Sequence, residues 1–172
     1  IADLTGIEDF DSLQDLDCDN NQLTTLDVSQ NTSLIELYCD DNQLTTLDVS
    51  ANTALEYLYC DNNQLTTLNL SANTALARLF CNNNQLISLD LRSGNNINIS
   101  TAWYGLDLSN NPQLYCIDVD DVSYSTINWT VAIGHISWWN SFSNDCTAET
   151  YGCTDPLASN FNASATINNG SC

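Results

Sequence analysis

Four cysteines recur at intervals of 21 residues, at Cys18, Cys39, Cys60 and Cys81. Thiols in such a series suit two kinds of chemistry, disulfide bonding and zinc coordination. Zinc needs four ligands that converge tetrahedrally, and a linear stack of equally spaced sulfurs does not provide that geometry. A free cysteine otherwise behaves as a small buried hydrophobe. We therefore expect reduced thiols in a core, and no metal site.

Each of these cysteines lies in a near-copy of one 21-residue segment. The copies span 12–32, 33–53, 54–74 and 75–95. In each, the apolar residues follow the pattern L-x-x-L-x-C-x-x-N-x-L, and the second half repeats that pattern. A short fixed period indicates a coil stacked on itself. The two alternating segments per copy predict two strands per turn, paired in parallel about 4.8 Å from the next turn.

Asparagine recurs at two positions of the same period. We expect these side chains to point inward at the turns and to satisfy backbone groups that would otherwise be buried without a partner. We interpret all of them as scaffold: Asn21, Asn42, Asn63, Asn84, Asn31, Asn52 and Asn73.

This pattern resembles the leucine-rich repeat from about residue 4 to residue 122. The 21-residue form with a core cysteine is similar to the cysteine-ladder repeats of internalin-type bacterial surface proteins, and to repeats of secreted Bacteroidetes proteins. The resemblance implies a β-rich leucine-rich repeat solenoid, a right-handed coil of short parallel strands with little helix. We expect about five coils over residues 1–119, followed by a disulfide-stapled C-terminal cap.

The fifth turn and the cap depart from the repeat. Residues 95–105 insert a longer loop, after which the pattern resumes with Val119 expected at the ladder-cysteine position. Residues 120–150 are rich in aromatic side chains and are predicted to cover the apolar end of the coil. Cys116 is out of register, so we expect it to point outward and to bond with Cys146. The cap sequence resembles that of the Bacteroidetes repeat proteins.

Residues 151–172 form a separate segment that is too short to bury a core, so we expect a Cys153–Cys172 bridge. It resembles a small GCTDP-type module of secreted marine Bacteroidetes proteins. That module usually carries two aspartates where this chain has Asn168 and Asn169, which weakens any calcium assignment there.

The charge balance restricts the partners. The chain has 22 acidic and two basic residues, a net charge of −20, so it repels nucleic acid and anionic membranes and attracts cations. The predicted bridges indicate an oxidising environment. No signal peptide or apolar membrane span is present, so we expect the processed product of a larger precursor, secreted by a bacterium or held at its surface.

The outward positions of the first strands form columns along the coil axis. An aromatic column beside acidic ones is typical of sugar binding, of a cross-strand ladder that only stabilises the sheet, or of protein contact, and the sequence leaves these three open. The candidate ligand-binding residues are Glu36, Tyr38, Asp40, Tyr57, Tyr59, Asp61, Arg78 and Phe80.

A third column holds Asp19, Asp40 and Asp61. Neighbouring carboxylates about 4.8 Å apart repel by about 1 kcal/mol per pair even in water. Calcium usually takes six to eight oxygens, which a flat column does not supply. We therefore expect no cofactor, and at most weak, diffuse binding of calcium or sodium.

The opposite face carries a threonine column whose aspartate neighbours make it poorly suited to ice binding. Modification is a further expectation for this chain. The glycosylation sequons expected to be exposed begin at Asn69, Asn98, Asn128, Asn162 and Asn169, and Ser12 lies in a three-residue match to a Bacteroidetes O-glycosylation motif.

Catalysis has little support, because the single histidine, His135, lies among apolar residues and no nucleophile, base and orienting group recur together. We predict a non-catalytic extracellular recognition or adhesion module that binds a glycan or a protein. The alternative is a structural subunit that assembles with copies of itself into a fibre or surface layer, because no cap segment precedes Leu4 and Ile7.

Overall fold

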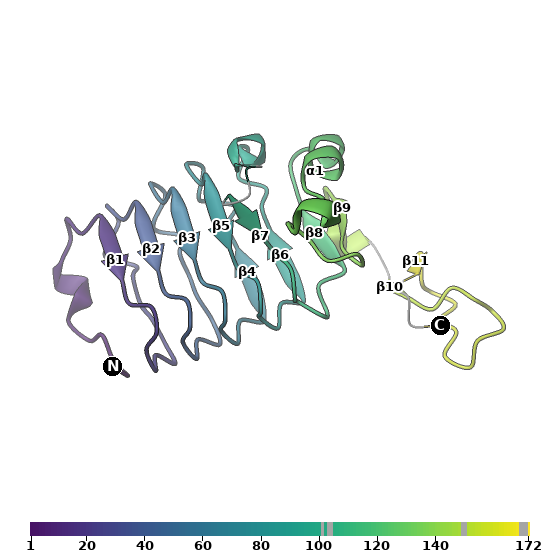
Figure 1. Ribbon diagram of the computed structural model, residues 1–172, viewed down its shortest axis with the longest axis horizontal. Coiled ribbons are helices and arrows are strands. Elements are labelled where there is room, and N and C mark those ends of the chain that lie inside the picture. Colours follow the sequence, from purple (N-terminus) through teal and green to yellow (C-terminus); the bar gives the residue numbers. More distant parts are fainter. Residues whose placement is uncertain (101, 103–104, 149–150, 169–171) are drawn as a thin grey trace.

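The computed structural model describes residues 1–100, 102, 105–148, 151–168 and 172. The chain winds as a flattened coil whose turns lie side by side from the N-terminus toward the C-terminus (Figure 1). In chain order the elements are η1 (Ile7–Asp9), β1 (Asp15–Asp17), β2 (Glu36–Tyr38), β3 (Tyr57–Tyr59), β4 (Thr67–Asn69), β5 (Arg78–Phe80), β6 (Ser88–Asp90), η2 (Asn96–Asn98), β7 (Leu106–Asp107), β8 (Cys116–Asp118), α1 (Val122–Asn128), η3 (Val131–Ile133), β9 (Ser141–Ser143), η4 (Cys146–Ala148), β10 (Tyr151–Gly152) and β11 (Ile167–Asn168). The η elements are 3₁₀ helices, so the fold is β-rich with little helix, as predicted.

The first strand of each turn builds a parallel sheet in the order β1-β2-β3-β5-β7. The register is that of the repeat, since Leu37 lies opposite Leu58 and Leu58 opposite Leu79. These leucines are fully buried. Because every copy has the same length, the pairing sets each residue beside its counterpart 21 positions later, and the predicted columns follow from it.

The second side of the coil differs from the prediction of two strands per turn. Its parallel sheet has the order β4-β6-β8-β9 and begins only in the third turn. There Leu70 N–H donates to Asp90 O at 2.8 Å, whereas within the described residues the amides of Val28 and Val49 make no such bond to the next turn. Val28 and Val49 are nevertheless fully buried. The second side of the first two turns is therefore held by the packing of these side chains and by asparagine side chains, since Asn52 donates to Val28 O and Asn73 to Val49 O, each at 3.0 Å.

The ladder cysteines and the inward asparagines have the roles predicted for them. Cys18, Cys39, Cys60 and Cys81 are free and buried. Asn63 is representative of the asparagines that follow them, since its amide nitrogen donates to Cys39 O at 3.0 Å and Cys60 O at 3.2 Å, and its oxygen accepts from Leu44 N–H at 2.9 Å. Each such side chain therefore joins two turns through their backbone.

The N-terminal segment, which includes Leu4 and Ile7, covers part of the first turn. Leu4 and Ile7 pack against the core. The amide of Asn31 donates to Ile7 O at 2.8 Å and to Phe10 O at 2.9 Å. This half-turn covers the second side only, and on the first side β1 ends the sheet, with no strand at its outer edge among the described residues.

The position expected for Val119 is wrong. Leu79 pairs with Leu106, which puts Leu108 in the ladder position after Cys81, while Asp90 pairs with Asp118, which puts Val119 after Leu91 on the second side. Both halves of a repeat have the same apolar pattern, so the sequence around the 95–105 insertion does not reveal on which side the chain resumes.

The predicted cap is one more, degenerate turn of the coil. Leu108 N–H donates to His135 O at 2.8 Å on the first side, and β9 pairs with β8 on the second. Trp129 is fully buried and meets Phe142 edge to face, with 5.7 Å between ring centroids. Aromatic side chains thus replace the leucines of the earlier turns.

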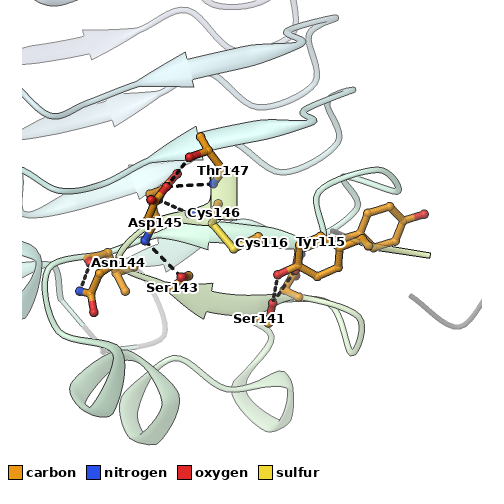
Figure 2. Close-up of a disulfide and its surroundings, with 12 residues drawn as sticks. Tyr115, Cys116, Ser141, Ser143, Asn144, Asp145, Cys146 and Thr147 are labelled. Atoms are coloured by element: carbon orange, nitrogen blue, oxygen red, sulfur yellow. Dashed lines mark hydrogen bonds between the residues drawn. A yellow bond between two sulfur atoms is a disulfide. The ribbon is translucent and has the colours of Figure 1, made fainter. Parts of the chain in front are cut away.

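The predicted Cys116–Cys146 disulfide staples this turn (Figure 2). Cys116 flanks the inward Ile117, and only 7% of its surface is accessible because its bonded partner covers it. Cys146 N–H also donates to the carboxylate of Asp118 at 2.8 Å. Arg92 binds Asp90 at 2.7 Å and donates to Asn144 O at 2.9 Å. The fourth turn, the fifth turn and the cap are therefore tied together by polar contacts that the repeat pattern did not indicate.

The C-terminal segment is closed by the predicted Cys153–Cys172 disulfide and contains the parallel pair β10–β11. Tyr151 attaches it to the cap, because its ring stacks on Tyr115 with 5.8 Å between centroids and its hydroxyl lies 2.9 Å from Ser141 Oγ.

Candidate functional site

The outward side chains of β1, β2, β3 and β5 form a face that we call the first-strand face. Strand pairing sets Glu36, Tyr57 and Arg78 in one column after Asp15. It sets Tyr38, Tyr59 and Phe80 in the next, between Asp17 and Asp107. The leucine at the centre of each strand is buried, so the face is made by the residues that flank these leucines. The strands themselves lie side by side along the coil (Figure 1).

The aromatic column is a continuous stack of rings. Tyr38 and Tyr59 lie with 4.8 Å between centroids and 22° between planes, and Tyr59 and Phe80 with 4.8 Å and 5°. Both faces of the Tyr59 ring are therefore covered by its neighbours. A pyranose needs an open ring face for stacking, and in this stack only the outer faces of Tyr38 and Phe80 remain. The column presents ring edges and hydroxyl groups to its surroundings.

The neighbouring column adds two specific contacts. The hydroxyl of Tyr38 donates to Glu36 Oε2 at 2.7 Å, and this hydrogen bond is the first cause of the raised pKa of Tyr38. Arg78 lies over the ring of Tyr57, 4.7 Å from its centroid, in a cation–π contact. The pKa of Arg78 is raised, first by a hydrogen bond with Tyr59. The positive charge on this face is the guanidinium of Arg78, which these two contacts hold in place.

The predicted acidic column lies at the turn beyond the strands. Asp40 and Asp61 are both half-buried. Burial raises the pKa of the Asp40 carboxyl, and burial together with the neighbouring charge of Asp40 raises the pKa of Asp61 to about 6. No group of three or more histidine, cysteine, aspartate or glutamate side chains in the described part of the chain is arranged to hold a metal ion. These carboxylates are charged at neutral pH at an electrostatic cost to the fold.

The second side carries hollows that the sequence pattern did not indicate. They lie between the first three turns, where the strand ladder is missing, and the largest measures about 480 Å³. Thr25, Thr46 and Thr67 line it together with Leu26 and Leu47. Asp48 also lines it, but its carboxylate already accepts from Ser50 N–H at 2.9 Å. Hydrogen bonds from the side chain and then from the backbone of Ser50 lower the pKa of Asp48. The aspartates here cap turns, and their charge stays incompatible with an ice-binding surface.

The candidate modification sites differ in accessibility. Asn69, Asn98, Asn162 and Ser12 are exposed, whereas Asn128 is half-buried and its amide donates to Tyr124 O at 2.8 Å. Asn169 lies outside the described residues. Asn31, which also begins a sequon, is fully buried, as expected from its place in the turn.

The single histidine is buried in the last turn of the coil. His135 is only 1% exposed and lies in the last turn of the coil. Neither ring nitrogen has a hydrogen-bond partner in the described structure. Packing is therefore the role that its position supports. No helix in the described part of the chain is long and apolar enough to span a membrane.

Comparison with known proteins agrees with this architecture. The family described as leucine-rich repeats (2 copies) matches residues 32–73. The functional domain of InlJ from Listeria monocytogenes, described as including a cysteine ladder, is 37% identical with a TM-score of 0.57, over 73% of this chain and 31% of that one. The internalin InlF of the same species is 19% identical with a TM-score of 0.45, over 68% and 45%. No curated protein matches the chain.

The chain thus spans about a third of the InlJ structure that it resembles, and less than half of InlF. InlJ is described as including a cysteine ladder, and this chain also has a series of four buried cysteines. The protein has a leucine-rich repeat fold and is similar to the internalins.

Proposed function

We propose that this chain is a non-catalytic extracellular recognition or adhesion module that binds a protein through the first-strand face. The stacked column of Tyr38, Tyr59 and Phe80 carries the proposal. These three rings are half-buried, and aromatic residues and arginine are enriched at protein interfaces. Because the inner ring faces are covered, the stack favours a protein surface, which can pack against ring edges, over a glycan that needs open faces.

The charged residues beside the stack indicate which surface charge the partner has. Glu36, Asp40 and Asp61 border the rings, and Asp17 and Asp107 lie at the two ends of the column. A surface that carries lysine or arginine is complementary to this border and is attracted to it at low ionic strength. Arg78 is placed to meet a carboxylate or sulfate within such a surface.

Binding of the labelled chain to arrays of extracellular proteins and of glycans tests the proposal. We expect binding to proteins with basic surfaces, weakened at high salt and lost in the Tyr59→Ala/Phe80→Ala variant. The matched control is Thr46→Ala/Thr67→Ala, which removes two side chains from the other side of the coil and leaves binding intact. Binding to glycans alone contradicts the choice of partner, and equal binding by both double variants contradicts the site.

A second candidate function is assembly into a fibre or surface layer, which the open edge of β1 favours. Asp15 and Asp17 flank that edge, and charged side chains at an edge strand oppose pairing with another chain. Electron microscopy of the concentrated protein separates the two functions, because filaments support assembly and dispersed particles contradict it.

An extracellular location is part of the same proposal, supported by the two disulfides and by the likeness to the internalins. Glycans at the exposed Asn69, Asn98 and Asn162 fit that location. Mass spectrometry of the protein from its native source tests each site, and unmodified peptides contradict the assignment.

A further inference from the structure

The charges on and beside the first-strand face are graded along the coil axis. Three columns run through the first four turns, and neighbours within a column come from successive turns. Each column begins with an aspartate and has no acidic side chain in the fourth turn. The columns are Asp15, Glu36, Tyr57 and Arg78; Asp17, Tyr38, Tyr59 and Phe80; and Asp19, Asp40, Asp61 and Asn82. The face is therefore acidic at β1 and carries its positive charge at β5.

Arg78 is held by aromatic side chains and not by a carboxylate. The chain has two basic residues, and the other one, Arg92, is paired with Asp90 at 2.7 Å. Within the described residues Arg78 forms no ion pair, although the chain has 22 acidic residues. Its contacts are the ring of Tyr57 and a hydrogen bond with Tyr59. A guanidinium has several N–H donors, so this exposed side chain keeps donors for an acceptor outside the chain.

The strand that follows β5 agrees with this. The pairing of β5 with β7 sets Gly105, which has no side chain, after Arg78 in its column. Asp107 follows in the neighbouring column, and its Oδ1 accepts from Ser109 N–H at 2.9 Å and from Ser109 Oγ at 2.6 Å. The carboxylate on this strand is thus bound to its own turn. The guanidinium of Arg78 can therefore bind a carboxylate of another molecule, the group that its planar shape fits best.

The two ends of the gradient are a fixed distance apart. β1 and β5 are the first and fourth strands of the sheet, so three strand spacings put Asp17 and Arg78 about 14 Å apart along the coil axis. An extended segment covers that length in about four residues, and a helix in about nine. The rings of Tyr38 and Tyr59 lie between the two ends. A segment of this length can meet both charges and pack on the rings between them.

We infer that the first-strand face binds a segment of its protein partner in one orientation along the coil axis, with lysine or arginine at β1 and a carboxylate at Arg78. The inference rests on the proposed function, because it requires this face to bind a protein. Charge complementarity carries it, since each end of the face then meets the opposite charge.

The same arrangement rejects other segments. In the reverse orientation the basic end meets Arg78 and the carboxylate meets the aspartates of β1, so like charges repel at both ends. A segment with basic side chains alone leaves the Arg78 guanidinium without a partner in the interface. Arg78 is therefore the residue that determines which basic segments fit this face.

Selection from a random peptide library displayed on phage identifies the segments that the intact chain binds. We expect the enriched peptides to carry an acidic and a basic residue about four positions apart, or about nine in a helical peptide, with an aromatic or aliphatic residue between them. They should not bind the Tyr59→Ala/Phe80→Ala variant. Arg78→Gln should weaken binding of a synthetic enriched peptide by about tenfold or more. Replacing the acidic residue of the peptide by its amide should cost as much, with no further loss in combination, because both changes remove one contact.

The acidic end has a control that is matched in charge. Asp15→Asn/Asp17→Asn and Asp27→Asn/Asp48→Asn each remove two negative charges, the first from the first-strand face and the second from the other side of the coil. Asn69 shows that asparagine suits the second position, because its side chain accepts the same turn hydrogen bond, at 2.9 Å, that Asp48 accepts. We expect the first variant to weaken peptide binding by about fivefold and the second to leave it unchanged. Circular dichroism and thermal unfolding establish that each variant is folded.

The outcomes separate this inference from the function on which it rests. If no peptide is enriched, or if the enriched peptides bind Tyr59→Ala/Phe80→Ala as well as the original chain, the proposed function fails and the inference with it. Enriched peptides that need Tyr59 and Phe80 but carry no carboxylate, or that bind Arg78→Gln with unchanged affinity, overturn the inference alone. An equal loss in the two aspartate variants overturns it as well, since net charge and not its arrangement then attracts the partner.

Discussion

The ring of Tyr59 lies parallel to that of Phe80, with 4.8 Å between centroids and 5° between planes. Tyr38 covers its other face. Tyr59→Ala removes both contacts at once, so we expect the free energy of unfolding to fall by about 1–2 kcal/mol. Urea denaturation followed by circular dichroism measures the change.

The control for this prediction is Tyr57→Ala in the same strand. Tyr57 makes a ring contact with Arg78 only, and an exposed cation–π contact is worth about 0.5–1 kcal/mol. A loss as large for Tyr57→Ala as for Tyr59→Ala contradicts the view that stacking stabilises this face.

Because the pKa of Asp61 is raised, we predict that the stability of the protein depends on pH. Its pKa is about 6 in the folded chain against 3.8 as the ordinary value. Between these values the folded state holds more protons than the unfolded state, so the contribution of this group falls as pH rises. Asp61→Asn copies Asn82 of the next turn and removes the penalty. We expect it to stabilise the protein by about 1 kcal/mol at neutral pH, after allowance for solvent screening, and to lose the advantage at acid pH.

Melting temperatures of Asp61→Asn at pH 4 and pH 7 check this sign, and an equal gain at both values is incompatible with it. Asp48→Asn is the control, because the pKa of Asp48 is lowered and the substitution should stabilise at neither pH. If the acidic column also binds cations weakly, calcium or sodium raises the melting temperature of the original chain more than that of Asp61→Asn. Calorimetry without such a difference excludes cation binding there.

Much of the fold follows from the period, and its failures have identifiable causes. Copies of equal length fix which residues are neighbours, so the Tyr38–Tyr59–Phe80 column was predictable. The tilt of the rings was not, because side-chain rotamers are set by packing that the pattern does not describe. That tilt decides which ring faces are open, and the proposal of a protein partner rests on it.

The errors about the strands have a similar origin. Val119 was placed on the wrong side because both half-turns share one apolar pattern. The missing strands near Val28 and Val49 reflect backbone geometry, since the third turn has the same apolar spacing and forms β4. The cap was recognised by its aromatic composition, but its continuation of the coil through β9 rests on contacts between residues without any repeat.

We predict that replacing the Asn63 side chain lowers the free energy of unfolding substantially. Its side chain donates to three carbonyl groups and accepts from Leu44 N–H, across two turns of the coil. Asn63→Ala leaves the buried Leu44 N–H without its partner, which costs about 1–3 kcal/mol. It also removes one hydrogen bond each from Cys39 O and Cys60 O, which keep those from Asn42 and Asn84, at about 1 kcal/mol per bond. We expect a loss of several kcal/mol in urea denaturation, against little change for Gln64→Ala, whose residue is exposed in the same turn. Similar losses for both would show that the asparagine ladder is not structural.

We predict that the ladder thiols do not react with thiol-specific reagents in the folded state. Burial raises the pKa of Cys39 and Cys60, and raises that of Cys18 to about 12. The thiolate is the reactive form, so a thiol-specific reagent should modify none of the four free cysteines until the chain unfolds in denaturant. Rapid labelling of the native protein would show that the ladder is accessible.

The central claim is that function belongs to the outward columns and not to the inward ladder that aligns them. Tyr59 and Cys60 test it most directly, because they are adjacent in the chain and point to opposite sides of the sheet. The measurement is the affinity of Tyr59→Ala and of Cys60→Ala for the partner identified on the protein array. The prediction is a loss of about tenfold or more for Tyr59→Ala and an unchanged affinity for Cys60→Ala. An unchanged affinity for Tyr59→Ala, or an equal loss for a folded Cys60→Ala, would contradict it.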